Sequence, residues 1–181
     1  MKKYTIEELK EQFKKLGYKW LPFMLIGIRS KEDNPNKFDD TFILVDGEEI
    51  KSFPNTTNPG VFWLKNPINS KGSAVLKAGQ YIDCWALGLH RGKYEALVQV
   101  RDVVVYRDKD RDVKSEETAV TDKGCFGINI HRANAGTVTQ MVDKNSAGCQ
   151  VFQNSKDFDY VISECKKSGQ KYFTYTLLKE F

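Results

Sequence analysis

The chain has 181 residues, of which 28 are basic and 24 acidic, and a formal net charge of +4 with neutral histidine. Its 40% hydrophobic, 12% aromatic and 29% charged residues are typical of a folded globular protein and exclude a disordered, collagen-like or disulfide-rich chain. A chain of this size buries roughly 70% of the surface that its unfolded form exposes, which suits a single hydrophobic core.

Two kinds of partner are excluded by the distribution of residues. The longest apolar stretch, residues 20–28, contains Pro22 and is far shorter than the ~20 residues of a membrane-spanning helix. Basic residues alternate with acidic ones and do not cluster with aromatic residues, so we expect no nucleic-acid surface. The N-terminus lacks the apolar core and cleavage site of a secretion signal.

The first predicted element is a short amphipathic helix. Thr5 followed by Glu8 has the pattern of a capping box, and Gly17 ends the helical pattern. Apolar residues recur at helical spacing between them, at Ile6, Leu9, Phe13 and Leu16. We therefore expect residues 1–20 to form an N-terminal helical extension.

Strand patterns dominate the rest of the chain. The Asp46-Gly47 turn between residues 41–45 and 49–53 predicts a β-hairpin. After Pro59-Gly60, the aromatic segment 61–64 is also expected to be a strand. Runs of β-branched and aromatic residues predict further strands at 23–28, 74–76, 80–89, 94–99, 103–106, 125–131 and 172–178.

A second helix is predicted near the C-terminus, with Ser155 as its N-cap and Gly169 at its end. Its apolar residues lie at i, i+3, i+4 and i+7, namely Phe158, Val161, Ile162 and Cys165. With no repeat or linker, the pattern predicts a mainly β domain, either a β-sandwich or a partly open barrel, with one helix at the start and one near the end.

The four cysteines lie far apart and form no C-x-x-C pair, so we expect no metal site and no cofactor. Cys84, Cys125 and Cys165 fall in strand or helix patterns and are predicted to be core residues. Cys149 differs, because it follows Ser146-Ala147-Gly148 and is preceded by His131 at the end of a strand pattern.

A cysteine thiol of ordinary pKa is mostly protonated at neutral pH and needs a base to become a nucleophile. His131 is the candidate base, and the small residues before Cys149 leave room for an acyl substrate and for backbone N–H donors. This combination indicates acyl transfer through Cys149. A buried, unreactive thiol is the alternative interpretation.

His131 and the Ser146-Ala147-Gly148-Cys149 segment resemble the signature of the L,D-transpeptidase (YkuD-type) catalytic domain family, which is a histidine, a loop and Ser/Thr-His-Gly-Cys. The upstream hairpin around Asp46-Gly47 and the Pro59-Gly60 segment are similar to that domain as well. The resemblance covers roughly residues 41–152. It implies an L,D-transpeptidase-like fold over residues 21–181.

The resemblance also implies a thioacyl mechanism on peptidoglycan stem peptides. Cys149 would be the nucleophile, His131 the general base and then acid, and the N–H groups of Gly148 and Cys149 the oxyanion donors. The main-chain carbonyl of Arg132 would orient His131. An amine acceptor would give transpeptidation, whereas water would give carboxypeptidase or endopeptidase cleavage.

The chain departs from the family pattern at three positions. The family has histidine where this chain has Ala147, glycine at Arg132, and asparagine or arginine at Val151. We expect these changes to alter substrate contacts. The expected substrate-binding residues are Arg132, Ser146, Gln150 and His90.

A non-catalytic cell-wall-binding or virion structural module with the same fold is the alternative function. Thiol redox chemistry or metal binding is a third. Without a visible signal peptide, action at the cell wall or periplasm would require export, a trimmed leader, or release of a phage-encoded protein at lysis; otherwise we expect a cytoplasmic or virion-associated protein. Nothing in the sequence indicates the oligomeric state.

Overall fold

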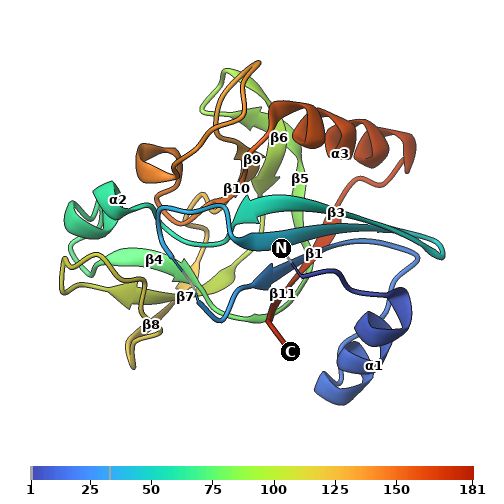
Figure 1. Ribbon diagram of the computed structural model, residues 1–181, viewed down its shortest axis with the longest axis horizontal. Helices are drawn as coiled ribbons and strands as arrows, with labels where there is room; N and C mark the ends of the chain where they lie inside the picture. The colour runs from blue at the N-terminus through green and yellow to red at the C-terminus, as the bar shows by residue number, and fades with distance from the viewer. Residues whose placement is uncertain (1, 33) are drawn as a thin grey trace.

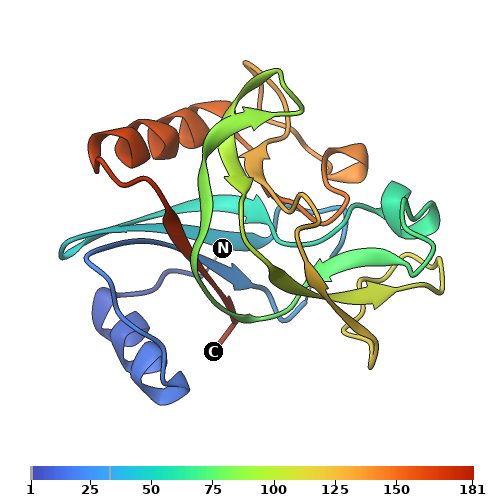
Figure 2. The same ribbon diagram turned by 180° about the vertical axis from the view of Figure 1, so that it is seen from behind.

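Residues 2–32 and 34–181 are described by the computed structural model, which is mainly β. Eight strands form a closed barrel in the order β1-β11-β5-β6-β9-β10-β3-β2, and β4, β7 and β8 form a separate three-stranded sheet. The helix α1 and the small sheet lie at opposite ends of the molecule, and α3 lies along one side of the barrel (Figures 1 and 2).

The helices are α1 (Ile6–Leu16), α2 (Val61–Lys65) and α3 (Ser155–Lys167), with a 3₁₀ turn η1 at Asp143–Asn145. The barrel strands are β1 (Phe23–Arg29), β2 (Asp40–Asp46), β3 (Glu49–Thr56), β5 (Gly79–His90), β6 (Tyr94–Gln99), β9 (Ile130–Arg132), β10 (Gln150–Phe152) and β11 (Phe173–Lys179). The small sheet contains β4 (Ser73–Leu76), β7 (Val103–Asp108) and β8 (Thr121–Gly124).

The strand β1 is buried on both faces, which explains its uninterrupted apolar sequence. Phe23 and Leu25 belong to the core inside the barrel. Met24 and Ile26 face the other way and belong to a second apolar cluster that contains Leu9 and other residues of α1. The N-terminal helix is thus packed against the outside of the barrel.

The predicted capping box of α1 is confirmed, because the Thr5 side chain accepts from the Glu8 N–H while Glu8 accepts from the Thr5 N–H. The hairpin prediction is also confirmed, with β2 and β3 paired from Asp40↔Asn55 to Asp46↔Glu49. The barrel closes through parallel pairing of β1 with β11, far apart in sequence. A partly open barrel was therefore wrong, and the sandwich alternative is replaced by the closed barrel plus the small sheet.

Two predicted strands are wrong. Residues 61–64 belong to the short helix α2, which begins after Gly60, where an added Cβ would lie 1.9 Å from the Asp143 carbonyl oxygen. Residues 125–129 are not a strand, and only Ile130–Arg132 pairs as β9. Gly127 has a φ of +72°, which interrupts the extended conformation.

Hydrogen bonds with side chains, and not a β-ladder, position the backbone of segment 125–129. The Gln99 amide oxygen accepts from the N–H groups of Phe126 and Ile128, at 3.1 and 2.9 Å. The Trp85 indole donates to the Ile128 carbonyl at 2.7 Å. Cys125 is consequently exposed, contrary to prediction, whereas Cys84 and Cys165 are buried as predicted.

The second helix occurs where it was predicted, but its N-cap is Asn154 and Ser155 is its first residue. The Asn154 side chain accepts from the Lys156 N–H, which is the N-cap hydrogen bond. The apolar residues that the spacing predicted are buried in the same hydrophobic core as Phe23 and Leu25; they are Phe158, Val161, Ile162 and Cys165.

A buried polar cluster joins the barrel to the small sheet. The Arg29 guanidinium donates to the carbonyls of Thr57 and of Leu76, the last residue of β4, at 3.1 and 3.0 Å. Asp40 accepts from the Thr57 N–H and hydroxyl at 2.6 and 2.7 Å, and its other oxygen accepts from the Ser30 N–H at 2.8 Å. This cluster fixes where the small sheet lies relative to the barrel.

Gly27 provides a test of packing inside the barrel. A Cβ at this position would lie 1.8 Å from the Tyr175 hydroxyl oxygen, and Tyr175 is completely buried. We expect Gly27→Ala to lower the free energy of unfolding by about 1–3 kcal/mol, because the tyrosine must move in a packed core. Urea unfolding followed by circular dichroism would measure it.

Gly79→Ala is the matched control, because a Cβ at Gly79 meets Tyr81 only at ordinary contact distance, 3.7 Å. We expect that change to remain within about 0.5 kcal/mol of the wild type. Equal effects of the two substitutions would contradict the packing argument.

Candidate active site

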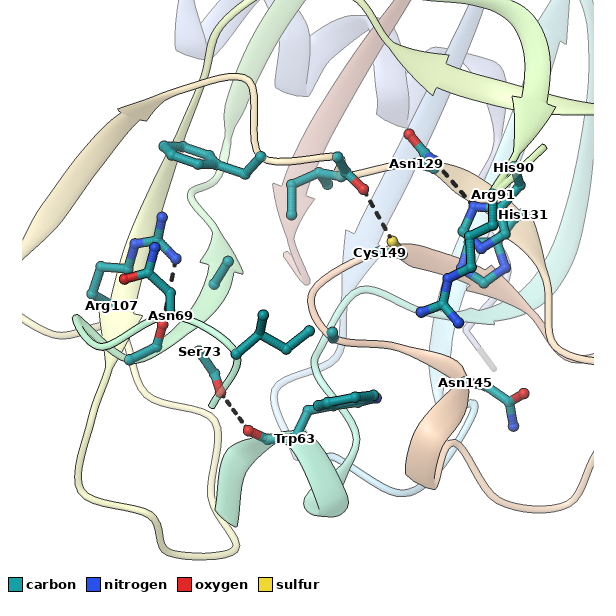
Figure 3. Close-up of a pocket in the computed structure, with 17 residues that line it drawn as sticks. Trp63, Asn69, Ser73, His90, Arg91, Arg107, Asn129, His131, Asn145 and Cys149 are labelled. Atoms are coloured by element: carbon teal, nitrogen blue, oxygen red, sulfur yellow. Dashed lines mark hydrogen bonds between the residues drawn. The ribbon is translucent and has the colours of Figure 1, made fainter. Parts of the chain in front are cut away.

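A cavity of about 450 Å³ lies between the barrel and the small sheet. Its walls come from β4 and β7, from the tip of the β5–β6 hairpin, from segment 126–129, from α2 and from the turn that ends at Cys149. Cys149, His131 and His90 all line it (Figure 3). Residues predicted to carry the chemistry from separate parts of the sequence are therefore brought together.

The turn at residues 146–149 is held by the hydroxyl of Ser146. This hydroxyl accepts from the Gly148 N–H at 3.2 Å and donates to the Cys149 carbonyl at 2.8 Å. Ser146 is completely buried. Its hydroxyl is thus engaged within the turn that presents Cys149.

Position 148 requires glycine for two reasons, its backbone conformation and the closeness of Ala74. Its φ is +125°, which side-chain-bearing residues rarely adopt. A Cβ there would also lie 2.4 Å from the Ala74 carbonyl oxygen of β4. The Gly148 N–H already donates to Ser146, so it is not free for a substrate oxygen in this conformation, whereas the Cys149 N–H has no protein acceptor within the described residues.

The hydrogen bonds of His131 define its tautomer. Its Nδ1 lies 2.8 Å from the Arg132 carbonyl oxygen, the contact that the family resemblance implies. Because a carbonyl oxygen only accepts, Nδ1 carries the proton and Nε2 of the neutral ring keeps a lone pair. The Tyr94 hydroxyl donates to the same carbonyl at 3.1 Å and lies 3.2 Å from Nδ1.

His90 stacks on His131, with ring centroids 4.0 Å apart and an interplanar angle of 21°. The Asn129 amide oxygen accepts from the Gln99 N–H, so its amide nitrogen is the atom 3.0 Å from His90 Nδ1. His90 Nδ1 therefore accepts, and its proton is on Nε2. Stacking and these hydrogen bonds hold both rings against the cavity wall.

Burial keeps both partners of the expected pair neutral. Desolvation lowers the pKa of His131 to about 3, with a smaller contribution from His90. Desolvation raises the pKa of the Cys149 thiol to about 11, although a backbone hydrogen bond from Asn129 and the charge of Arg91 act in the opposite direction. At neutral pH the cavity therefore holds a protonated thiol and a neutral imidazole.

The other expected substrate-binding residues do not line the cavity that contains Cys149. The Arg132 guanidinium stacks over Tyr94 at 4.5 Å and pairs with Asp159 at 3.4 Å, along a different cavity. Gln150 is completely buried, and its side-chain oxygen accepts from the Tyr175 hydroxyl at 2.8 Å. Of the four, His90 alone lines the cavity with Cys149.

Sequence reasoning missed several lining residues. Arg91 follows His90 at the hairpin tip, and Asn129 precedes the strand that carries His131. Trp63 approaches from α2, where its indole donates to the Lys144 carbonyl at 3.0 Å. The Arg91-Gly92 pair between two strand patterns was a usable turn signal, whereas nothing in the local pattern places Trp63 near Cys149.

Within the described residues, one cluster of three acidic side chains is compact enough to share a metal ion. Its members are Asp110, Asp112 and Glu116, whose ligand atoms lie within 4.8 Å of one another. None of them lines the cavity. Among the helices of the same residues, none is both long and apolar enough to cross a membrane.

Gly148→Ala tests the turn. We expect the substitution to displace Cys149, because the strained φ and the clash with Ala74 both oppose it. The rate of Cys149 alkylation by iodoacetamide, followed by peptide mass spectrometry, should change at least severalfold. Gly136→Ala is a control with a similarly positive φ of +82° but open space around its Cβ. An unchanged rate in Gly148→Ala would refute the proposed constraint.

The pH dependence of alkylation tests the neutral pair. Since the pKa of Cys149 is about 11, its thiolate fraction and alkylation rate should rise about tenfold per pH unit between pH 7 and 10. A rate that levels off between pH 6 and 9 would instead indicate a thiolate–imidazolium pair. His131→Ala should leave the slope unchanged, because His131 is already neutral in this range.

The chain was compared with protein-family models, with curated proteins and with solved structures, and no match was found in any of the three.

Proposed function

We propose that this protein is a cysteine acyl-transferase or hydrolase that acts on peptidoglycan stem peptides through a thioacyl intermediate at Cys149. The observation that carries the chemistry is the geometry of one cavity. It contains a cysteine on a constrained turn and a histidine whose Nδ1–H is held by a main-chain carbonyl. The choice of stem peptides rests on the resemblance of residues 146–149 to the L,D-transpeptidase signature.

In the resting structure the Cys149 thiol donates to the Gly127 carbonyl at 3.4 Å. In the first step the thiol leaves this acceptor, and His131 Nε2 takes its proton as the sulfur attacks the peptide carbonyl. The carbonyl oxygen becomes an oxyanion, for which the Cys149 N–H is the available main-chain donor. The bond to the leaving amine then breaks, and the imidazolium returns its proton to that amine. A thioester between the acyl group and Cys149 remains.

The second step depends on the acceptor. Water or an amine loses a proton to His131 as it attacks the thioester, and the Cys149 sulfur leaves and regains a proton. Water yields hydrolysis and an amine yields a cross-link. The stacked His90 ring holds one face of His131, which keeps the imidazole in one orientation through both proton transfers.

The protein must reach the wall in order to act there. We propose export, or release of a phage-encoded protein at lysis, as the route. Either route is compatible with the cysteine and histidine chemistry.

Purified muropeptides test the function. Incubation with tetrapeptide and cross-linked muropeptides, followed by mass spectrometry, should show loss of a terminal D-residue, a new cross-link or an adduct on Cys149. Cys149→Ala and His131→Ala should each reduce turnover at least a hundredfold. Cys125→Ala is the matched control, because Cys125 is exposed and does not line the cavity. No turnover and no adduct over several stem peptides would overturn the proposal.

One observation favours the alternative of a non-catalytic wall-binding or virion structural module. The pKa of Cys149 is raised to about 11, so the thiol lacks the lowered pKa common in activated cysteines. Binding to isolated sacculi separates the two functions. Retention that survives Cys149→Ala, together with no product from the wild type, would support the binding module.

A further inference from the structure

The guanidinium of Arg91 carries the least compensated charge in the cavity. Arg91 is exposed at the tip of the β5–β6 hairpin and lines the cavity together with Cys149 (Figure 3). Within the described residues it has neither a hydrogen bond nor an ion pair. None of the residues that line the cavity is acidic.

Arg107 lines the same cavity and provides the contrast. Its guanidinium pairs with Asp122 at 3.2 Å and donates to the Gly72 carbonyl at 3.3 Å. Its plane also covers Phe126 at 4.6 Å. The charge of Arg107 is therefore largely compensated within the protein, whereas that of Arg91 is available to a ligand.

The structure of the hairpin tip fixes the position of the Arg91 backbone. Residues 91–93 form the three-residue loop of the hairpin, in which Arg91 and Gly92 have φ values of +50° and +68°. His90 and Tyr94, which flank the turn, are a paired position of β5 and β6. His90 is further held by Asn129 and by its stacking on His131. The backbone of Arg91 is therefore adjacent to His90, whose ring stacks on the candidate base His131.

We propose that Arg91 binds a free carboxylate on the acyl donor, close to the carbonyl that Cys149 attacks, so that the site selects anionic acyl peptides over their amidated counterparts. A guanidinium suits this task, because its planar donors match a carboxylate and its charge is permanent. This inference rests on the proposed function for its reaction, but the binding of a carboxylate can be measured without turnover.

The kinetic test uses two short peptidyl thioesters that differ only in a free carboxylate or a primary carboxamide beside the reactive carbonyl. Intact-protein mass spectrometry follows acylation of Cys149. We expect the wild type to favour the carboxylate probe by about tenfold, and the preference to fall as salt is added. Arg91→Asn should abolish the preference, and Arg91→Lys should retain part of it.

These variants are chosen to keep the hairpin intact. Asparagine tolerates a positive φ, so Arg91→Asn removes the charge without straining the turn. Lys93→Asn is the matched control, because Lys93 is an exposed cation on the same hairpin that does not line the cavity. It should leave the preference unchanged.

The binding test uses Cys149→Ala protein and the corresponding unreactive peptides, titrated in a calorimeter. The carboxylate peptide should bind more tightly than the amide, and Arg91→Asn in the same background should remove the difference. If Cys149 is acylated but Arg91→Asn slows both probes equally, Arg91 acts on the thiol and carboxylate recognition is overturned. If Cys149 is never acylated but the Arg91-dependent difference in binding remains, the proposed function fails and the carboxylate site stands.

Discussion

The position of the small sheet against the barrel depends on a buried polar cluster, in which Arg29 binds Thr57 and the end of β4 and Asp40 binds Thr57. A buried guanidinium is costly unless its donors are satisfied. Here the Thr57 hydroxyl and two main-chain carbonyls accept from Nε and Nη2, and the Glu117 carboxylate accepts from Nη1 at 3.4 Å. Burial raises the pKa of Asp40, and its hydrogen bonds and the charge of Arg29 oppose that effect. The cluster therefore favours one position of the small sheet, because other positions would leave buried polar groups without hydrogen-bond partners.

The position of the small sheet decides the shape of the cavity. Arg29 binds the carbonyl of Leu76 at one end of β4, and the Ala74 carbonyl of the same strand contacts Gly148. The Ser146 hydroxyl in turn holds the main chain at the Gly148 N–H and at the Cys149 carbonyl. A continuous set of polar and steric contacts therefore connects the wall of the barrel to the sulfur of Cys149.

The sequence patterns succeeded where local rules govern the structure. The capping box of α1, the Asp46-Gly47 hairpin and the apolar spacing of α3 each depend on residues close together in the chain. The patterns failed at residues 125–129, which Gln99 and Trp85 hold from other strands. His131 and Cys149, which line the same cavity, were predicted from chemistry and spacing. Arg91 was not predicted, because only the fold brings the hairpin tip to the cavity.

The parallel pairing of β1 with β11 also sets the order in which the molecule is assembled. During synthesis β1 is made before β11 and has to wait for it, so the barrel closes only after β11 has been made. Tyr175 of β11 then inserts below Gly27 and hydrogen-bonds Gln150, the residue after Cys149. The cavity around the thiol is consequently completed at the end of folding, and a chain that has not yet closed its barrel cannot carry out chemistry that needs it.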